Sequence, residues 1–82
     1  MTLREASLAI ETSALCEYDG RIYYAYSLVY TKNARGICIW SLVLHERRAN
    51  STIQVLLDRV KVVNWNMPDY LVEVRLKGER GS

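Results

Sequence analysis

The run from Arg21 to Thr31 constrains the fold of this chain more than any other segment. β-Branched and aromatic residues dominate it, and such residues suit a pleated, half-buried surface. Asp19-Gly20 precedes the run, and Asp-Gly favours a type I′ hairpin turn because both central residues need positive φ. We therefore predict a hairpin whose second strand covers residues 21–31. With strict alternation, one face of that strand carries Ile22, Tyr24, Tyr26, Leu28 and Tyr30, and the other carries Tyr23, Ala25, Ser27 and Val29.

Two neighbouring runs extend this hairpin into an antiparallel meander. Residues 7–18 alternate weakly between apolar and polar side chains and predict the first strand. Residues 32–36 are typical of a turn, and the run from Ile37 to Glu46 predicts the third strand. Both faces of this third strand are largely apolar, which indicates a central position or a second covered face.

Helical signals replace the alternation after residue 50. The segment 51–54, Ser-Thr-Ile-Gln, fits a capping box, and apolar side chains then recur at helical spacing as far as Val63. A second helix is predicted with Asn66 as its cap, Pro68 and Asp69 in its first turn, and Gly78 as its stop. The predicted fold class is α+β, a three-stranded antiparallel meander followed by two C-terminal helices.

An all-β fold is the alternative. Residues 53–63 also fit an irregular strand, and residues 70–77 alternate as a strand would. Those two strands would complete an all-β five-stranded small barrel. The capping residues favour a helix for the last segment, whereas the period favours a strand.

Length and composition are those of one small folded unit. The chain has 82 residues, and we place a single small domain at residues 1–78 and a frayed polar tail at residues 79–82. Half of the residues are apolar and 24% are charged, which is typical of a globular chain. With two cysteines, no secretory leader and no apolar stretch of about 20 residues, we expect a cytoplasmic protein without membrane contact.

Short motifs follow one another in a characteristic order over residues 21–76. They are the strand opening Gly36-Ile37-Cys38-Ile39, the segment from Asn64 to Pro68, and then Leu71, Glu73 and Val74. This order resembles that of a family of small uncharacterised proteins from Firmicutes, chiefly clostridia. The chain has Arg35 where that family tends to have Tyr, and Tyr70 where it tends to have His. The resemblance implies an α+β domain with a small sheet and C-terminal helices, and it implies no activity.

The residues offer little for catalysis. His45 is the only histidine, and Glu46 would point to the opposite face of a strand, so it is a poor partner for orienting the imidazole. Cys16 and Cys38 lie in apolar strand contexts, which disfavour a reactive thiolate. Metal-type cysteine spacing and a phosphate-binding glycine loop are both missing from the sequence. We expect no cofactor and no metal, and an enzyme built on His45 is the least favoured function.

The aromatic residues carry more information about function. The chain has six tyrosines, two tryptophans and no phenylalanine, so every aromatic ring carries a polar group. Such rings suit surfaces that are partly dry and partly wet, as at interfaces. We therefore predict a small non-catalytic binding or regulatory domain that contacts a protein partner or a second copy of itself. The predicted contact residues are Tyr23, Tyr24, Trp40 and Arg35. In the competing interpretation, Tyr24, Tyr26 and Tyr30 cover the core beneath the helices.

Nucleic acid is the alternative partner. Sheets that bind RNA or single strands combine exposed rings with basic flanks. The basic candidates here are Lys32, Arg35, Arg47 and Arg48. The formal net charge is only +2, which is small for affinity driven by phosphate contacts, so protein contact is preferred.

Overall fold

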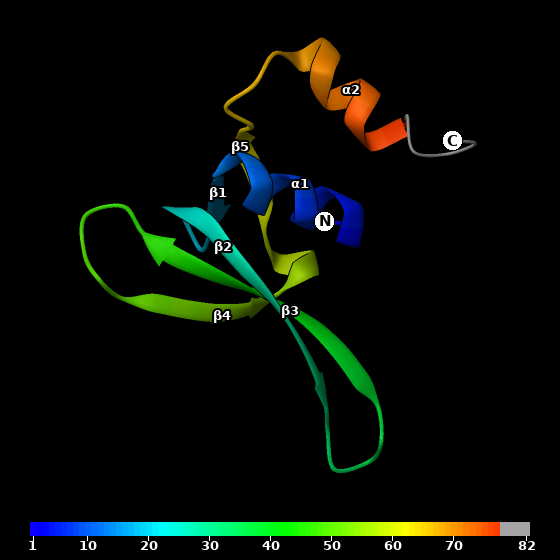
Figure 1. Ribbon diagram of the computed structural model, residues 1–82. Helices are drawn as coiled ribbons and strands as arrows, with labels where there is room; N and C mark the ends of the chain where they lie inside the picture. The colour runs from blue at the N-terminus through cyan, green and yellow to red at the C-terminus, as the bar shows by residue number, and fades with distance from the viewer. Residues whose placement is uncertain (78–82) are drawn as a thin grey trace.

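The computed structural model describes residues 1–77 (Figure 1). The elements in chain order are α1 (Leu3–Thr12), β1 (Leu15–Tyr18), β2 (Arg21–Lys32), β3 (Cys38–Glu46), β4 (Thr52–Leu56), the 3-10 turn η1 (Leu57–Arg59), β5 (Lys61–Asn64) and α2 (Asp69–Lys77). The predicted helix stop at Gly78 and the predicted tail at residues 79–82 lie outside the described residues.

The strands form one open sheet in the order β4-β3-β2-β1-β5, and every neighbouring pair is antiparallel. The α+β class is therefore confirmed. The three-stranded meander followed by two C-terminal helices is wrong, because the sheet has five strands and a helix precedes it. The small barrel is also wrong, because the sheet does not close and β4 and β5 are its two edges.

The predicted turns around β2 are present. Asp19 and Gly20 have φ values of 53° and 77°, as a type I′ turn requires, and Tyr18 pairs with Arg21 across it. At the other end of β2, the Asn33 side-chain oxygen accepts hydrogen bonds from the amides of Arg35 (2.8 Å) and Ile37 (3.1 Å). This local network closes the turn between β2 and β3.

The first segment is a helix where a strand is predicted. The Thr2 hydroxyl accepts a hydrogen bond from the Glu5 amide (3.1 Å), and the Glu5 carboxylate accepts one from the Thr2 amide (2.7 Å). This capping box satisfies two amides at the start of α1. Only the last four residues of the predicted strand, Leu15–Tyr18, are extended. The helix prevails because its cap is complete and its small residues Ala6 and Ala9 fit tightly against the sheet.

The segment after residue 50 is extended where a helix is predicted. The Ser51 hydroxyl donates to the Glu46 carboxylate (2.8 Å), so it is not a helix cap. Residues Thr52–Leu56 pair with β3 from Ser41 to His45, and η1 then leads into β5. A strand prevails because β3 has a free edge here whose backbone groups need partners, and pairing with β4 satisfies them.

The last helix is present, but it begins at Asp69, and the predicted cap Asn66 does not adjoin it. Asn66 has a left-handed backbone (φ 59°), and its side-chain nitrogen donates to the carbonyls of Thr12 (3.3 Å) and Ser13 (2.8 Å). It therefore ties the connection between β5 and α2 to the end of α1. Asn64 ends β5, and its side-chain oxygen accepts a hydrogen bond from the Asn66 amide (2.9 Å).

The core lies between α1 and one face of the sheet. Its buried members come from α1, from the three central strands, and from the connections just before β1 and just before β5: Ala6, Ala9, Ala14, Cys16, Tyr23, Ala25, Leu42, Leu44 and Val60. Half-buried side chains such as Ile53, Val55 and Val62 extend it to both edge strands. Side chains on the other face of these strands are not part of this cluster.

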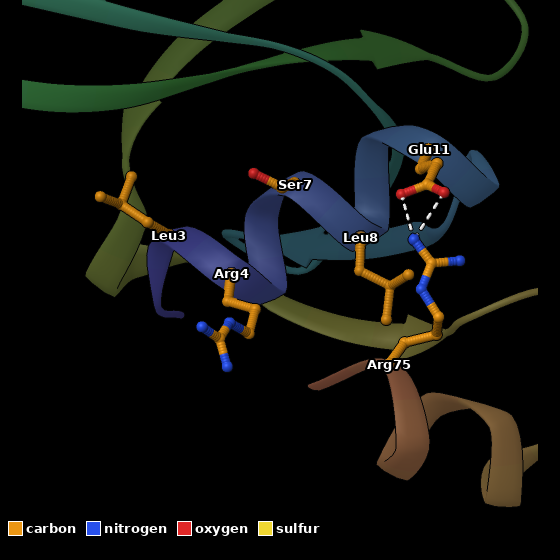
Figure 2. A pocket seen from close by; sticks show the side chains of 6 residues that line it. All are labelled: Leu3, Arg4, Ser7, Leu8, Glu11 and Arg75. Carbon is orange, nitrogen blue, oxygen red and sulfur yellow. Dashed lines mark hydrogen bonds and ion pairs between the residues drawn. The ribbon is translucent and has the colours of Figure 1, made fainter. Parts of the chain in front are cut away.

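Helix α2 packs on the side of α1 that faces away from the sheet (Figure 1). One Arg75 nitrogen contacts both carboxylate oxygens of Glu11 at 2.6 and 2.7 Å, and Arg4 donates to the Leu76 carbonyl at 2.9 Å. Figure 2 shows the Arg75–Glu11 contact, with Leu8 pointing toward α2. These three side chains line a depression of about 330 Å³. In residues 1–77, neither helix is long and apolar enough to cross a membrane.

Candidate functional site: an uncovered sheet face and a projecting arm

A β-bulge in β2 decides which tyrosines face the core. Ala25 pairs with Leu44 and Ser27 pairs with Val43, so Tyr26 is the extra residue on its strand. The bulge reverses the alternation, since Tyr23 and Ala25 face the core before it and Leu28 does so after it. The predicted alternating faces are therefore wrong beyond residue 26. The competing prediction, that Tyr24, Tyr26 and Tyr30 cover the core, is also wrong, because none of them belongs to it.

The opposite side of the sheet carries what we call the open face. It consists of the side chains of β2, β3 and β4 that point away from the core: Ile22, Tyr24, Tyr26, Ser27, Val29, Ser41, Val43, His45, Thr52, Gln54 and Leu56. None of them is Asp, Glu, Lys or Arg. Tyr26 is 61% exposed and Leu56 is 45% exposed. This face is therefore uncharged, and it sets apolar side chains such as Val29, Val43 and Leu56 among hydroxyl, amide and imidazole groups.

His45 is held in place on the open face. Its ring lies edge-on to Tyr26, with centroids 6.0 Å apart and planes at 75°. Its Nδ1 is 3.3 Å from the Ser51 carbonyl, which selects the tautomer that carries a proton on Nδ1. Cys16 faces the core, and Cys38 is at the far end of β3, roughly 20 Å along the strand. The structure therefore does not bring a cysteine to His45.

The tip of the β2–β3 hairpin forms a second surface, which we call the arm (residues 30–40). Strand β1 pairs with β2 only as far as Tyr24, and β4 pairs with β3 only from Ser41. Beyond these points the ribbon has two strands, and it extends away from the helices (Figure 1). A two-stranded ribbon has no core of its own, so its side chains stay accessible.

The arm carries a pair of aromatic rings. Tyr30 and Trp40 are directly opposed, with ring centroids 4.5 Å apart and planes at 34°. Tyr30 is 57% exposed and Trp40 is 37% exposed. A side-chain hydrogen bond with Cys38 raises the pKa of Tyr30, and partial desolvation adds to the shift. Lys32 is directly opposite Cys38, two cross-strand pairs nearer the tip than the rings, so this lysine lies on the same face as they do.

The predicted contact residues do not form one site. Tyr23 is 5% exposed and belongs to the core, so it cannot anchor a partner. Tyr24 lies on the open face, Trp40 on the arm and Arg35 in the exposed turn at its tip. Tyr26 and Tyr30 are exposed on these two surfaces but were not among the predicted contact residues. The high number of tyrosines in this one strand was a signal that some of them are exposed. The bulge that decides which ones has no sequence signature.

The four basic residues of the nucleic-acid alternative fall into two pairs. Lys32 and Arg35 are on the arm, whereas Arg47 and Arg48 follow β3, roughly 30 Å away along the strand. Arg47 and Arg48 line a shallow depression of about 370 Å³ together with Tyr24 and His45. The predicted nucleic-acid site therefore combined side chains that the fold places at opposite ends of β3.

The described residues contain little that would bind a metal ion or stabilise a thiolate. In residues 1–77, no group of three or more His, Cys, Asp or Glu side chains is arranged to hold a metal ion. Burial raises the pKa of Cys16 from 9.0 to about 11, which keeps this thiol protonated near neutral pH. Comparison of the chain with protein-family models, curated proteins and solved structures gave no match in any of the three.

Proposed function

We propose that this chain is a small non-catalytic binding domain whose docking surface is the open face, and that its partner is a second copy of the chain. One observation carries the proposal: across β2, β3 and β4 this face has no Asp, Glu, Lys or Arg, and it presents Tyr26 and Leu56 to solvent. The centres of protein interfaces are depleted in charge and enriched in aromatic residues in the same way.

Burial of this face favours association. Removing apolar surface from water contributes about 25 cal/mol per Å². The half-buried Val29 and Val43 lie beside the exposed Tyr26 and Leu56, so a covering layer would bury all four side chains together. Tyr24 and Tyr26 would act as anchors, because their rings supply contact area while their hydroxyls can still reach polar partners.

A second copy fits this face better than a charged partner does. In a two-fold symmetric dimer the same patch meets itself, so a patch with one sign of charge would repel its copy. The open face avoids that repulsion, and its Ser, Thr, Gln and Tyr groups can both donate and accept hydrogen bonds. Two such sheets stacked about 10 Å apart would make a sandwich with the helices outside.

The test compares two tyrosine-to-lysine variants of the full chain by sedimentation velocity. Tyr26→Lys places a charge at the centre of the open face, whereas Tyr70→Lys changes a similarly exposed tyrosine (67%) on α2. We expect the unmodified chain and Tyr70→Lys to sediment as dimers, and Tyr26→Lys to dissociate with a Kd at least about tenfold higher. Far-UV circular dichroism should be the same for all three proteins.

Two results would overturn the proposal. If Tyr26→Lys dimerises as tightly as the unmodified chain, the open face is not the interface. If the unmodified chain stays monomeric at all concentrations, the second copy is not its partner.

A further inference from the structure

The arm carries exposed side chains that the proposed dimer would not cover. Its ring pair, Tyr30 and Trp40, is on the side of the ribbon opposite the open face, because Trp40 shares its face with the core residue Leu42. Sheet-to-sheet association through the open face would therefore leave these rings uncovered. Exposed aromatic rings on a thin ribbon lose water contact only when a ligand covers them.

The charge on the arm has a single sign. Lys32 and Arg35 are its only charged side chains, and both are exposed. The chain has no Asp or Glu between Asp19 and Glu46, so no carboxylate lies along the ribbon. The formal net charge of the whole chain is only +2, but at the arm positive charge is not offset by neighbours. Such a local field attracts a polyanion.

The rings and the cations are in line. Tyr30 and Trp40 form one cross-strand pair, and Lys32 follows on the same face about 7 Å nearer the tip. Arg35 then lies in the turn that closes the hairpin. A flat ring pair followed by two cations matches a ligand in which flat groups alternate with negative charges.

We propose that the arm binds single-stranded nucleic acid, with bases stacking on Trp40 and Tyr30 and phosphates contacting Lys32 and Arg35. Single strands expose the base faces that such rings stack on, and this stacking tolerates any sequence. A duplex hides those faces, and an acidic polypeptide would use the cations without needing the rings. The proposal does not depend on dimer formation, although a dimer would present two arms.

Trp40 provides a direct optical signal for binding. The chain has two tryptophans, and Trp65→Phe leaves Trp40 as the only one. We would titrate this variant with oligo(dT) of about 15 nucleotides at about 20 mM salt. We expect quenching of Trp40 fluorescence, and the anisotropy of a labelled oligonucleotide should confirm binding to the unmodified chain. No binding in either measurement would overturn the proposal.

Matched double variants test the cations. Lys32→Gln/Arg35→Gln and Arg59→Gln/Lys61→Gln remove the same net charge, but Arg59 and Lys61 lie in η1 and β5, away from the arm. We expect the arm variant to bind roughly tenfold more weakly, and its slope of log Kd against log salt to fall by about 1.4, two phosphates at about 0.7 each. The control should bind within about twofold of the unmodified chain. Equal weakening of both variants would mean that only net charge matters.

Ring removal and competitors test the rest of the proposal. Trp40→Leu and Tyr30→Leu should each weaken oligonucleotide binding, measured by anisotropy, with unchanged circular dichroism. Unchanged affinity in both would exclude stacking. If poly-glutamate or a duplex of the same length competes as well as oligo(dT), the ligand is an acidic polypeptide or duplex DNA and the single-strand proposal is wrong.

Discussion

Tyr26 lies edge-on to His45 across the open face, with their ring centroids 6.0 Å apart. This contact exists because Tyr26 is the extra residue of the bulge in β2. A β-bulge changes the direction in which side chains point, and bulges are common next to functional sites. Here the bulge turns Leu28 toward the core and leaves Tyr26 61% exposed beside the only histidine of the chain.

The open face should be sensitive to charge on β4 as well as on β2. We expect Leu56→Lys to weaken dimerisation, because it would bury an ammonium group against its symmetry copy or its apolar neighbours. Val74→Lys on α2 is the control, since Val74 is 57% exposed and Leu56 is 45% exposed. Sedimentation equilibrium of both variants measures the effect. Equal dimer affinities would place the interface away from β4.

Two adjacent tyrosines should differ strongly in their contribution to stability. Tyr23 is 5% exposed in the core, whereas Tyr24 is half-buried on the open face. We expect Tyr23→Ala to lower the free energy of unfolding by about 3–5 kcal/mol, as for other large aromatic side chains removed from cores. Tyr24→Ala should cost about 1 kcal/mol in the monomer. Urea denaturation at low protein concentration measures both, and similar losses would contradict the assigned faces.

The two capping-box sequences of the chain should respond differently to alanine. Thr2 caps α1 through the Glu5 amide, so Thr2→Ala should cost about 1 kcal/mol of stability and Thr2→Ser should restore most of it. The Ser51 hydroxyl donates to the Glu46 carboxylate in a solvent-exposed hydrogen bond, so Ser51→Ala should change stability by less than about 0.5 kcal/mol. Thermal unfolding followed by circular dichroism checks both. A larger loss for Ser51→Ala would indicate that the segment after it is helical.

Stability should fall with rising pH through the range set by Cys16. Burial raises its pKa from 9.0 to about 11, so the unfolded chain releases the thiol proton before the folded chain does. The unfolded state is therefore favoured progressively as the pH rises from 9 to 11, by at most about 3 kcal/mol. Cys16→Ala should remove this part of the pH dependence. An unchanged slope of unfolding free energy against pH in Cys16→Ala would contradict the shift.

Local chemistry predicted part of the fold. Asp19-Gly20 and the alternating run after it specify their turn and strand with short-range interactions, and both are present. The last helix also forms where Pro68 and Asp69 indicate it. These elements could be predicted because their determining contacts are within a few residues.

Other elements depended on partners far away in the sequence. Residues 53–63 satisfy both a helical stripe and a strand, and the free edge of β3 decided between them. The bulge at Tyr26 arises from the register with β3, so alternation alone placed Tyr26 with Leu28 on one face. Tyr23 was predicted as a contact residue because the sequence does not show which face of the sheet α1 covers. That choice depends on tertiary packing, which places Tyr23 in the core.

Light scattering of the unmodified chain after size-exclusion chromatography, over a wide range of concentrations, tests self-association through the open face most directly. We predict a molar mass near twice 9.5 kDa that falls toward 9.5 kDa only on dilution or in Tyr26→Lys. A mass of 9.5 kDa at every concentration would contradict a dimer, and a dimer that Tyr26→Lys leaves intact would contradict its assignment to this face.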